Sequence, residues 1–338
     1  MRKTAANAEL TVTGYPARMS DHGQASPSAE TIEDVLRAEL AHGDAVVATT
    51  GPVLHHLLVN DDQTLFSDQT IARVRGMVTD IARQLLFAVA EEIESPMKPA
   101  FVEAHANDLA ASLLGDASFL AHAHTLTIEA QIAERLSQRS GVDPVLSPLL
   151  QELAASSDAD IAASAMRTLA SQARFFQQQR RMSLPLSELP QRLFDLALSV
   201  LRIQLAEEHA EGLENVEARL REEYNPSARR EQQIAWLINA MQHDATRAID
   251  VDHSGVGIFA SALAMASGQS RGAVILSLGE KQCARLALSL LTAGMKNSEV
   301  EEQFLFLHPE INLPEGFDAL TKEQASAMLA GAQSGQTH

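Results

Sequence analysis

Apolar residues recur at steps of three and four along most of this chain, the spacing that places side chains on one face of an α-helix. The clearest stripe begins near Ser67–Asp68 and runs through Ile71 to Val89. The short run 46–50 alternates poorly for a strand and is interpreted as the end of a helix. The pattern predicts an all-α fold of stacked antiparallel helices, which we expect to end at Ser95–Pro96, Gly115, Gly141, Asn225–Pro226 and Gly294 and before Pro309, with a last helix over 322–329.

A HEAT-like helical pair is predicted in the middle of the chain. Residues 144–155 and 161–176 each carry an apolar stripe, and the turn SSDAD at 156–160 separates them. Two short amphipathic helices around a turn that contains aspartate are typical of one unit in a helical repeat protein. The aspartates of this turn are expected to cap the second helix.

The stretch RFFQQQRRMSLPLSELP, from Arg174 to Pro190, is interpreted as a helix end followed by a joint. Arginines in the last turn of a helix interact favourably with the helix dipole, and Pro185 prevents the helix from continuing. Ser187 is expected to cap the next helix, with Pro190 inside its first turn.

This joint divides the predicted fold into an N-terminal helical domain, residues 29–182, which includes the HEAT-like pair, and a C-terminal helical bundle, residues 183–328. In the second part we expect one long helix from Pro190 through Gly212, a helix over 234–249, and a Gly- and Ala-rich helix around 258–263. The unpatterned ends, 1–28 and 329–338, are expected to be flexible tails.

Composition and charge exclude several classes of protein. The net charge is −18 and the isoelectric point is about 5.0, so the phosphate backbone of a nucleic acid would be repelled. The single cysteine excludes a disulfide within the chain and fits a reducing compartment. No apolar run is long enough to span a membrane, and the N-terminus lacks the apolar segment of a signal peptide. We therefore expect a cytoplasmic protein.

Two blocks of the second half resemble a known family. They are RFFQQQRRMSLPLSELPQRLFDLAL, residues 174–198, and SGVGIFASALAMASGQSRGAVILSLGEKQCARLALSLLTAGM, residues 254–295. With the segments around them, over about 145–310, they are similar to a bacterial all-helical family of uncharacterised proteins, a domain of unknown function with HEAT-like helical pairs. The resemblance implies an all-α fold and a bacterial origin, and it supplies no catalytic residues.

Motifs for nucleotide binding and nucleophilic catalysis are missing from the sequence. Gly272 and Gly279 are too far apart for a phosphate-binding loop, and Gly255 and Gly257 lack the third glycine of a dinucleotide site. No GxSxG occurs, and the SxxK at Ser95 lacks its partner motifs. We predict no cofactor and no catalytic residue.

Metal-binding patterns are missing as well. Neither Glu-x-x-His nor His-Glu-x-x-His occurs, and His122 and His124 point to nearly opposite sides of a helix. The histidines are interpreted as exposed or partly packed side chains, Cys283 as a core residue, and the acidic stretch DVDHSG at 250–255 as a helix-capping turn. We predict no metal site.

One charge feature stands out around the joint. Residues 151–200 hold five acidic and five arginine residues in a chain of net charge −18, whereas residues 201–250 hold ten acidic residues and six arginines. The candidate docking residues are Arg174, Arg180, Arg181, Met182 and Arg192, opposed only by Glu188. Three interpretations remain open: helix-end cations with a solvated charged face, a docking patch for an acidic or apolar partner, or internal pairing with the acidic residues of 201–250.

The sequence favours a non-enzymatic protein-binding or regulatory module, because stacked helices offer surfaces for partner recognition and no catalytic constellation is visible. The partner is expected to be a protein, acidic in one interpretation, or a second copy of the chain. The alternatives are an enzyme or metal-binding protein whose site is dispersed along the sequence, and a self-associating structural protein.

Overall fold

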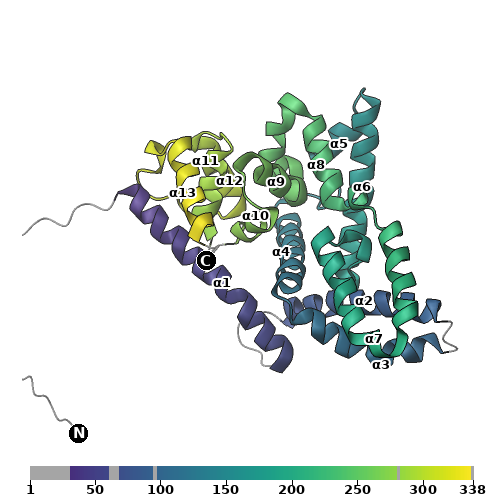
Figure 1. Cartoon of the computed structure of the whole chain (residues 1–338). Coiled ribbons are helices and arrows are strands. Elements are labelled where there is room, and N and C mark those ends of the chain that lie inside the picture. The colour runs from purple at the N-terminus through teal and green to yellow at the C-terminus, as the bar shows by residue number, and fades with distance from the viewer. Residues whose placement is uncertain (1–30, 61–67, 94–96, 280–281, 336–338) are drawn as a thin grey trace, which may run out of the picture. The chain divides into compact units, whose positions relative to one another are not determined.

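The computed structural model describes residues 31–60, 68–93, 97–279 and 282–335 of the chain (Figure 1). Every regular element in these ranges is helical, which confirms the all-α prediction. The α-helices are α1 (Ile32–Asn60), α2 (Asp68–Glu92), α3 (Lys98–Leu114), α4 (Ala117–Ser140), α5 (Pro148–Ala154), α6 (Ala159–Arg181), α7 (Gln191–Glu223), α8 (Arg230–Ala240), α9 (Val251–Ser267), α10 (Arg271–Ser277), α11 (Cys283–Thr292), α12 (Asn297–Leu307) and α13 (Lys322–Gly335). Short 3₁₀ helices are η1 (Leu186–Glu188), η2 (Pro226–Ala228), η3 (Gln242–Ile249) and η5 (Phe317–Ala319).

The helices of the first half follow the predicted stripes. The inner face of α2, with Val74, Val78 and Ile81, is fully buried. Gly141 closes α4 in the left-handed conformation, with φ of 74°, which glycine adopts without strain. The run 46–50, predicted as a helix end, lies in the interior of α1. Ser67 and Ser95–Pro96 lie outside the described residues.

Helices α5 and α6 pack against each other and are connected by a short turn, as predicted. Ser147 caps α5, and its hydroxyl accepts a hydrogen bond from the Leu150 amide. Asp158 caps α6 by accepting from the amides of Asp160 and Ile161. The capping role expected for the SSDAD turn is therefore confirmed.

Helix α7 was expected to be one long rod, and its contacts show that it doubles back. Arg202 Nε donates to Glu217 Oε1 at 2.7 Å, and the Phe194 and Tyr224 rings stack with centroids 4.2 Å apart. Thirty residues of straight helix would separate these two rings by about 45 Å. The helical run therefore forms two neighbouring arms, and the connection between them lies between Arg202 and Glu217. Figure 1 shows the two arms of α7 beside each other.

The joint between α6 and α7 is attached to α2 by hydrogen bonds between its backbone and two side chains of α2. Asp80 accepts from the Leu184 amide at 2.9 Å. Gln84 donates to the Leu184 carbonyl at 2.9 Å and accepts from the Leu186 amide at 3.1 Å. The joint is therefore held in one conformation by α2. The expected cap at Ser187 is wrong, because that residue lies within η1 and Pro190 is the N-cap of α7.

Met182 ends α6 in the left-handed conformation, with φ of 53°, and lies against α2 at Gly76. A Cβ atom on residue 76 would be 2.6 Å from the Met182 Cβ. We expect Gly76→Ala to lower the free energy of unfolding by about 1–3 kcal/mol. In a Met182→Gly background the loss should be smaller, because the opposing Cβ is gone. Urea unfolding of the four proteins of this double-mutant cycle measures the coupling, and strictly additive losses would contradict the close contact.

The second half departs from the predicted helices at three places. The expected helix over 234–249 is broken after α8, where Gln242 adopts a φ of 50° and η3 begins. A separate short helix, α10, was not predicted, because its apolar residues, 273–276, are consecutive and show no steps of three and four. Helix α13 extends to Gly335, since Ala332 continues the face that packs on the core. The cap expected in DVDHSG is confirmed: the Asp250 carboxylate accepts from the Asp252 amide.

The chain from Ile32 onward forms one compact unit, and the predicted boundary between residues 182 and 183 falls inside it. Helix α7 packs on α2 and α3, and α4 packs on α9 and α10. Residues 1–28, predicted as a tail, lie outside the described part. None of the described helices combines the length and the apolar character needed to cross a bilayer.

Candidate functional site: a basic face over a buried ionic network

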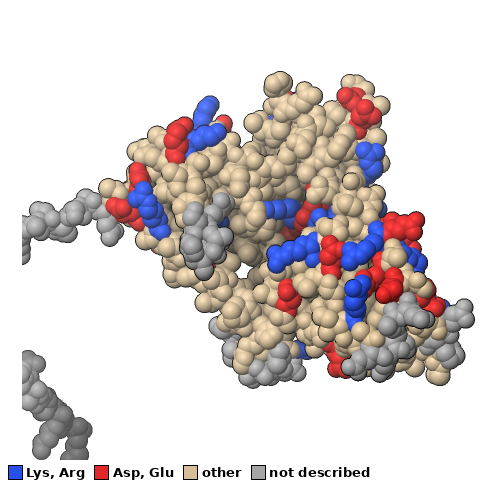
Figure 2. Space-filling model, in the orientation of Figure 1, with Lys and Arg blue, Asp and Glu red and all other residues tan. Residues whose placement is uncertain are grey.

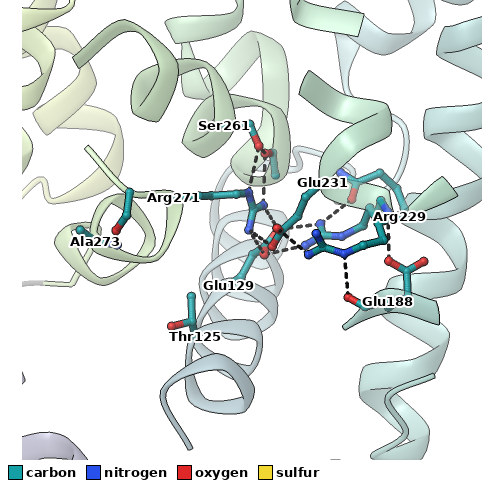
Figure 3. A network of polar contacts seen from close by, with 12 residues as sticks. Thr125, Glu129, Glu188, Arg229, Glu231, Ser261, Arg271 and Ala273 are labelled. Atoms are coloured by element: carbon teal, nitrogen blue, oxygen red, sulfur yellow. Dashed lines mark hydrogen bonds and ion pairs between the residues drawn. The ribbon is translucent and has the colours of Figure 1, made fainter. Parts of the chain in front are cut away.

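A carboxylate in α4 is the centre of a buried ionic network. Glu129 is 1% exposed, and each of its oxygens accepts two hydrogen bonds (Figure 3). Arg230 donates to both oxygens at 2.7 Å. Arg271 donates to Oε1 at 2.8 Å and to Oε2 at 2.9 Å. Two forked guanidinium groups therefore saturate one carboxylate.

Further contacts of the two arginines connect five helices. Arg230, which begins α8, donates to Gln172 Oε1 of α6 at 2.8 Å and lies over the Phe175 ring at 3.8 Å from its centroid. Arg271, which begins α10, donates to the Ser261 hydroxyl of α9 at 2.9 Å. Helices α4, α6, α8, α9 and α10 thus meet at this point. We call Glu129, Gln172, Arg230 and Arg271 the Glu129 network.

Gly257 lets α9 approach the Glu129 network closely. A Cβ atom at this position would be 2.7 Å from Gln172 Nε2 and 3.3 Å from Glu129 Oε1. The Gly257 carbonyl also accepts from Arg271 at 3.4 Å. The glycine is needed here for close packing, which agrees with the sequence-based conclusion that it belongs to no dinucleotide motif.

The electrostatics of the Glu129 network oppose proton transfer. Burial alone raises the pKa of Glu129, but Arg230 and Arg271 outweigh it and hold that pKa well below its usual range. Because all four hydrogen bonds to the carboxylate come from arginines, no lone pair is directed at a substrate. The arrangement fixes helices in place and is unsuited to a general base. Glu129 and Arg271 are 142 positions apart, so no local motif could reveal the network.

A small cavity of about 20 Å³ lies beside the Glu129 network, next to His122, Phe175 and Arg230. A cavity of this size holds one water molecule. The His122 Nε2 atom is buried and has no hydrogen-bond partner among the described residues. Burial is the main cause that lowers the pKa of His122 to about 4. The charge of nearby Glu231 acts in the opposite direction, and three nearby cations, Arg229, Arg271 and Arg230, lower the pKa further.

Two other histidines are more deeply buried than the sequence predicted. The expectation that histidines are exposed or partly packed is wrong for His124 and His308, which are 7% and 5% exposed. Desolvation lowers the pKa of His124 to about 4. His124 lies on the inner side of α4, and His308 is the residue that caps the end of α12. In both places a polar ring packs among apolar residues, which the pattern did not show. Cys283 is half-buried and packs against the core, as expected.

All five predicted docking residues, Arg174, Arg180, Arg181, Met182 and Arg192, are exposed. Among the described residues, the four arginines form no ion pair and no side-chain hydrogen bond. Arg180 and Arg181 lie in the last turn of α6, as predicted. Glu188 does not neutralise these arginines, because its carboxylate accepts a hydrogen bond from the Arg230 amide at the start of α8.

The internal-pairing interpretation is wrong for the described side chains, because no acidic residue of 201–250 among them pairs with Arg174, Arg180, Arg181 or Arg192. Glu217 binds Arg202, and Asp195 binds Arg221 from the opposite arm. Figure 2 shows basic and acidic side chains interleaved over the α7 region. The described acidic side chains of 201–250 therefore leave the arginines of α6 uncompensated.

The structure adds three residues to the predicted patch. Arg167, Arg174 and Arg181 are exposed and follow one another at seven-residue steps, so they lie on one side of α6. No acidic residue occurs between 161 and 187. Met166 is 54% exposed, and Trp236 of α8 is 47% exposed, with the Arg167 guanidinium 5.9 Å from its ring centroid. We call Met166, Arg167, Arg174, Arg181 and Trp236 the basic face.

The basic face and the Glu129 network lie on opposite sides of the same helix. Gln172, Phe175 and Gln179 are buried on the inner side of α6, and Gln172 and Phe175 contact Arg230. The exposed arginines alternate with them at helical spacing. The structure does not connect Arg192 or Met182 to this face, because Arg192 belongs to α7 and Met182 turns toward Gly76. The seven-residue arginine repeat was the sequence signal that could have shown Arg167.

Within the described residues, no three His, Cys, Asp or Glu side chains are grouped in a way that could hold a metal ion. The resemblance to a bacterial helical family over residues 145–310 stays a prediction. Comparisons of the chain with family models, with curated proteins and with solved structures give no match.

Proposed function

We propose that this protein is a non-enzymatic, protein-binding helical module that docks its partner on the basic face. The observation that carries the proposal is the row of three exposed, uncompensated arginines on α6 in a chain of net charge −18. Exposed cations without partners lose little hydration when an acidic surface approaches them, and they steer that surface to one place. Tryptophan, arginine and methionine are also among the residues that are enriched in protein interfaces.

The Glu129 network supports this proposal from the other side of α6. Gln172 and Phe175 hold the inner side of α6 against Arg230, which also fixes the start of α8. Trp236 of α8 and the arginines of α6 are therefore presented on a rigid surface, and a preorganised surface costs less conformational entropy on binding. The HEAT-like character of the α5–α6 pair and a cytoplasmic location belong to the same proposal.

Charge reversal of the basic face tests the function. We expect tagged wild-type protein to capture a stoichiometric partner from its native cells, and Arg174→Glu/Arg181→Glu to lose it. With the identified partner purified, calorimetry should give at least a tenfold weaker dissociation constant for the variant, because two attractive contacts become repulsive. Higher ionic strength should weaken wild-type binding in the same direction.

The matched control is Arg135→Glu/Lys98→Glu, which reverses two exposed charges on α4 and α3. This variant carries the same change in net charge and should bind as the wild type does. Equal losses in both variants would assign the effect to overall charge. A partner that binds the Arg174→Glu/Arg181→Glu variant normally would overturn the proposal.

A further inference from the structure

We infer that the partner presents an acidic amphipathic α-helix, which lies lengthwise along α6 and places carboxylates seven residues apart opposite Arg167, Arg174 and Arg181. This inference rests on the proposed function and names the chemistry of the partner. It is carried by the spacing of the three arginines together with the exposed apolar side chains at one end of the row.

The spacing of the arginines selects the secondary structure of the partner. Seven residues of α-helix advance about 10 Å and return to nearly the same side. A second helix packed lengthwise has the same repeat, so it can present one carboxylate to each arginine. An extended strand cannot, because residues on one side of a strand recur at about 7 and 13 Å.

The apolar end of the basic face selects an amphipathic helix over a merely acidic one. Met166 and Trp236 are about half exposed and flank Arg167. One apolar partner residue beside the first carboxylate would cover the Trp236 ring, which already lies against the Arg167 guanidinium. Covering such a ring removes apolar surface from water, which adds affinity and fixes the direction of the helix.

The charge of the rest of the chain favours a protein over a polyphosphate. Acidic side chains are interleaved with basic ones over the α7 region (Figure 2), and the net charge of −18 repels an extended polyanion. The density of negative charge on the partner therefore does not suffice for binding. The spacing of the carboxylates along the partner matters as well.

Trp236 provides a direct measurement, because it is the only tryptophan in the chain and belongs to the basic face. The probe is a capped, alanine-rich peptide of about three helical heptads, without tryptophan, with a glutamate every seventh position and a leucine beside the first glutamate. We expect it to change the fluorescence of Trp236 in full-length protein saturably. Its dissociation constant should be at least tenfold weaker for Arg174→Glu/Arg181→Glu, and unchanged for Arg135→Glu/Lys98→Glu.

Two comparison peptides make the test specific. The first has the same composition with glutamates every fifth position, which spreads the charge around the helix; the second has two central prolines, which break it. Both should bind at least tenfold more weakly. Equal binding of all three peptides, or of heparin, would overturn the helical partner. Loss of a native partner on charge reversal, combined with equal peptide binding, would leave the proposed function standing and reject only this partner class.

Discussion

Replacing Glu129 by glutamine is expected to lower the free energy of unfolding by about 3–5 kcal/mol, a large part of the 5–15 kcal/mol of a typical domain. The change keeps the volume of the side chain and removes only its charge. Arg230 and Arg271, which are 4% and 14% exposed at their side chains, then lack the anion that compensates their burial. Urea denaturation followed by circular dichroism measures the loss.

Glu103→Gln is the control for this prediction, because Glu103 also pairs with an arginine but is 66% exposed. Its loss should stay below about 1 kcal/mol, since solvent screens exposed pairs. If Glu129→Gln does not fold, the apolar triple variant Glu129→Leu/Arg230→Met/Arg271→Met should restore a folded protein. A Glu129→Gln protein as stable as the control would show that the Glu129 network does not hold the helices together.

The protein is expected to lose stability between pH 6.5 and 4.5 because of His122 and His124. Burial lowers the pKa of each to about 4 in the folded state, from an ordinary value of 6.5. The unfolded chain therefore binds more protons in this window, and stability falls as the pH falls. The loss is about 2 kcal/mol for each histidine over these two pH units. Urea unfolding at a series of pH values measures it.

The pH range from 6.5 to 4.5 distinguishes the contribution of the histidines to stability from that of the buried carboxylates. Burial raises the pKa of Glu129 and Glu231, but the nearby arginines hold both below their ordinary value. Their contribution to stability is therefore lost only below about pH 4.5. His122→Gln and His124→Gln should each flatten the profile between pH 6.5 and 4.5, whereas His243→Gln, at an exposed residue, should leave its slope unchanged. A wild-type profile that is flat over this window would contradict the burial of the two rings.

The local sequence predicted most helices because their signals are local. Apolar steps of three and four identified α2, α4 and α6, and short-range capping chemistry located their ends, as with Asp158 before α6 and Gly141 after α4. Where the apolar residues are consecutive, as in α10, the same reasoning found nothing. The exposed arginines of α6 were also visible in the sequence, because an excess of one charge needs no tertiary information.

Only the tertiary structure decided what those residues face. The fold-back of α7 brings Phe194 and Tyr224 into a stack between two arms that a periodic pattern cannot distinguish from one straight helix. The Glu129 network joins side chains up to 142 positions apart. Long-range contacts of this kind follow from the packing of whole helices, and no spacing along the chain encodes them.

For the candidate site, the sequence by itself determined that positive charge collects near the end of α6, and it left open whether acidic residues elsewhere in the chain neutralise that charge. The structure decided this point for the described side chains, because none of the acidic ones pairs with the arginines of α6, which remain exposed. The same structure brought Trp236 beside Arg167. Composition sets how much charge a chain carries, whereas folding sets which charges meet, since ion pairs act over a few ångströms that only the packed helices define.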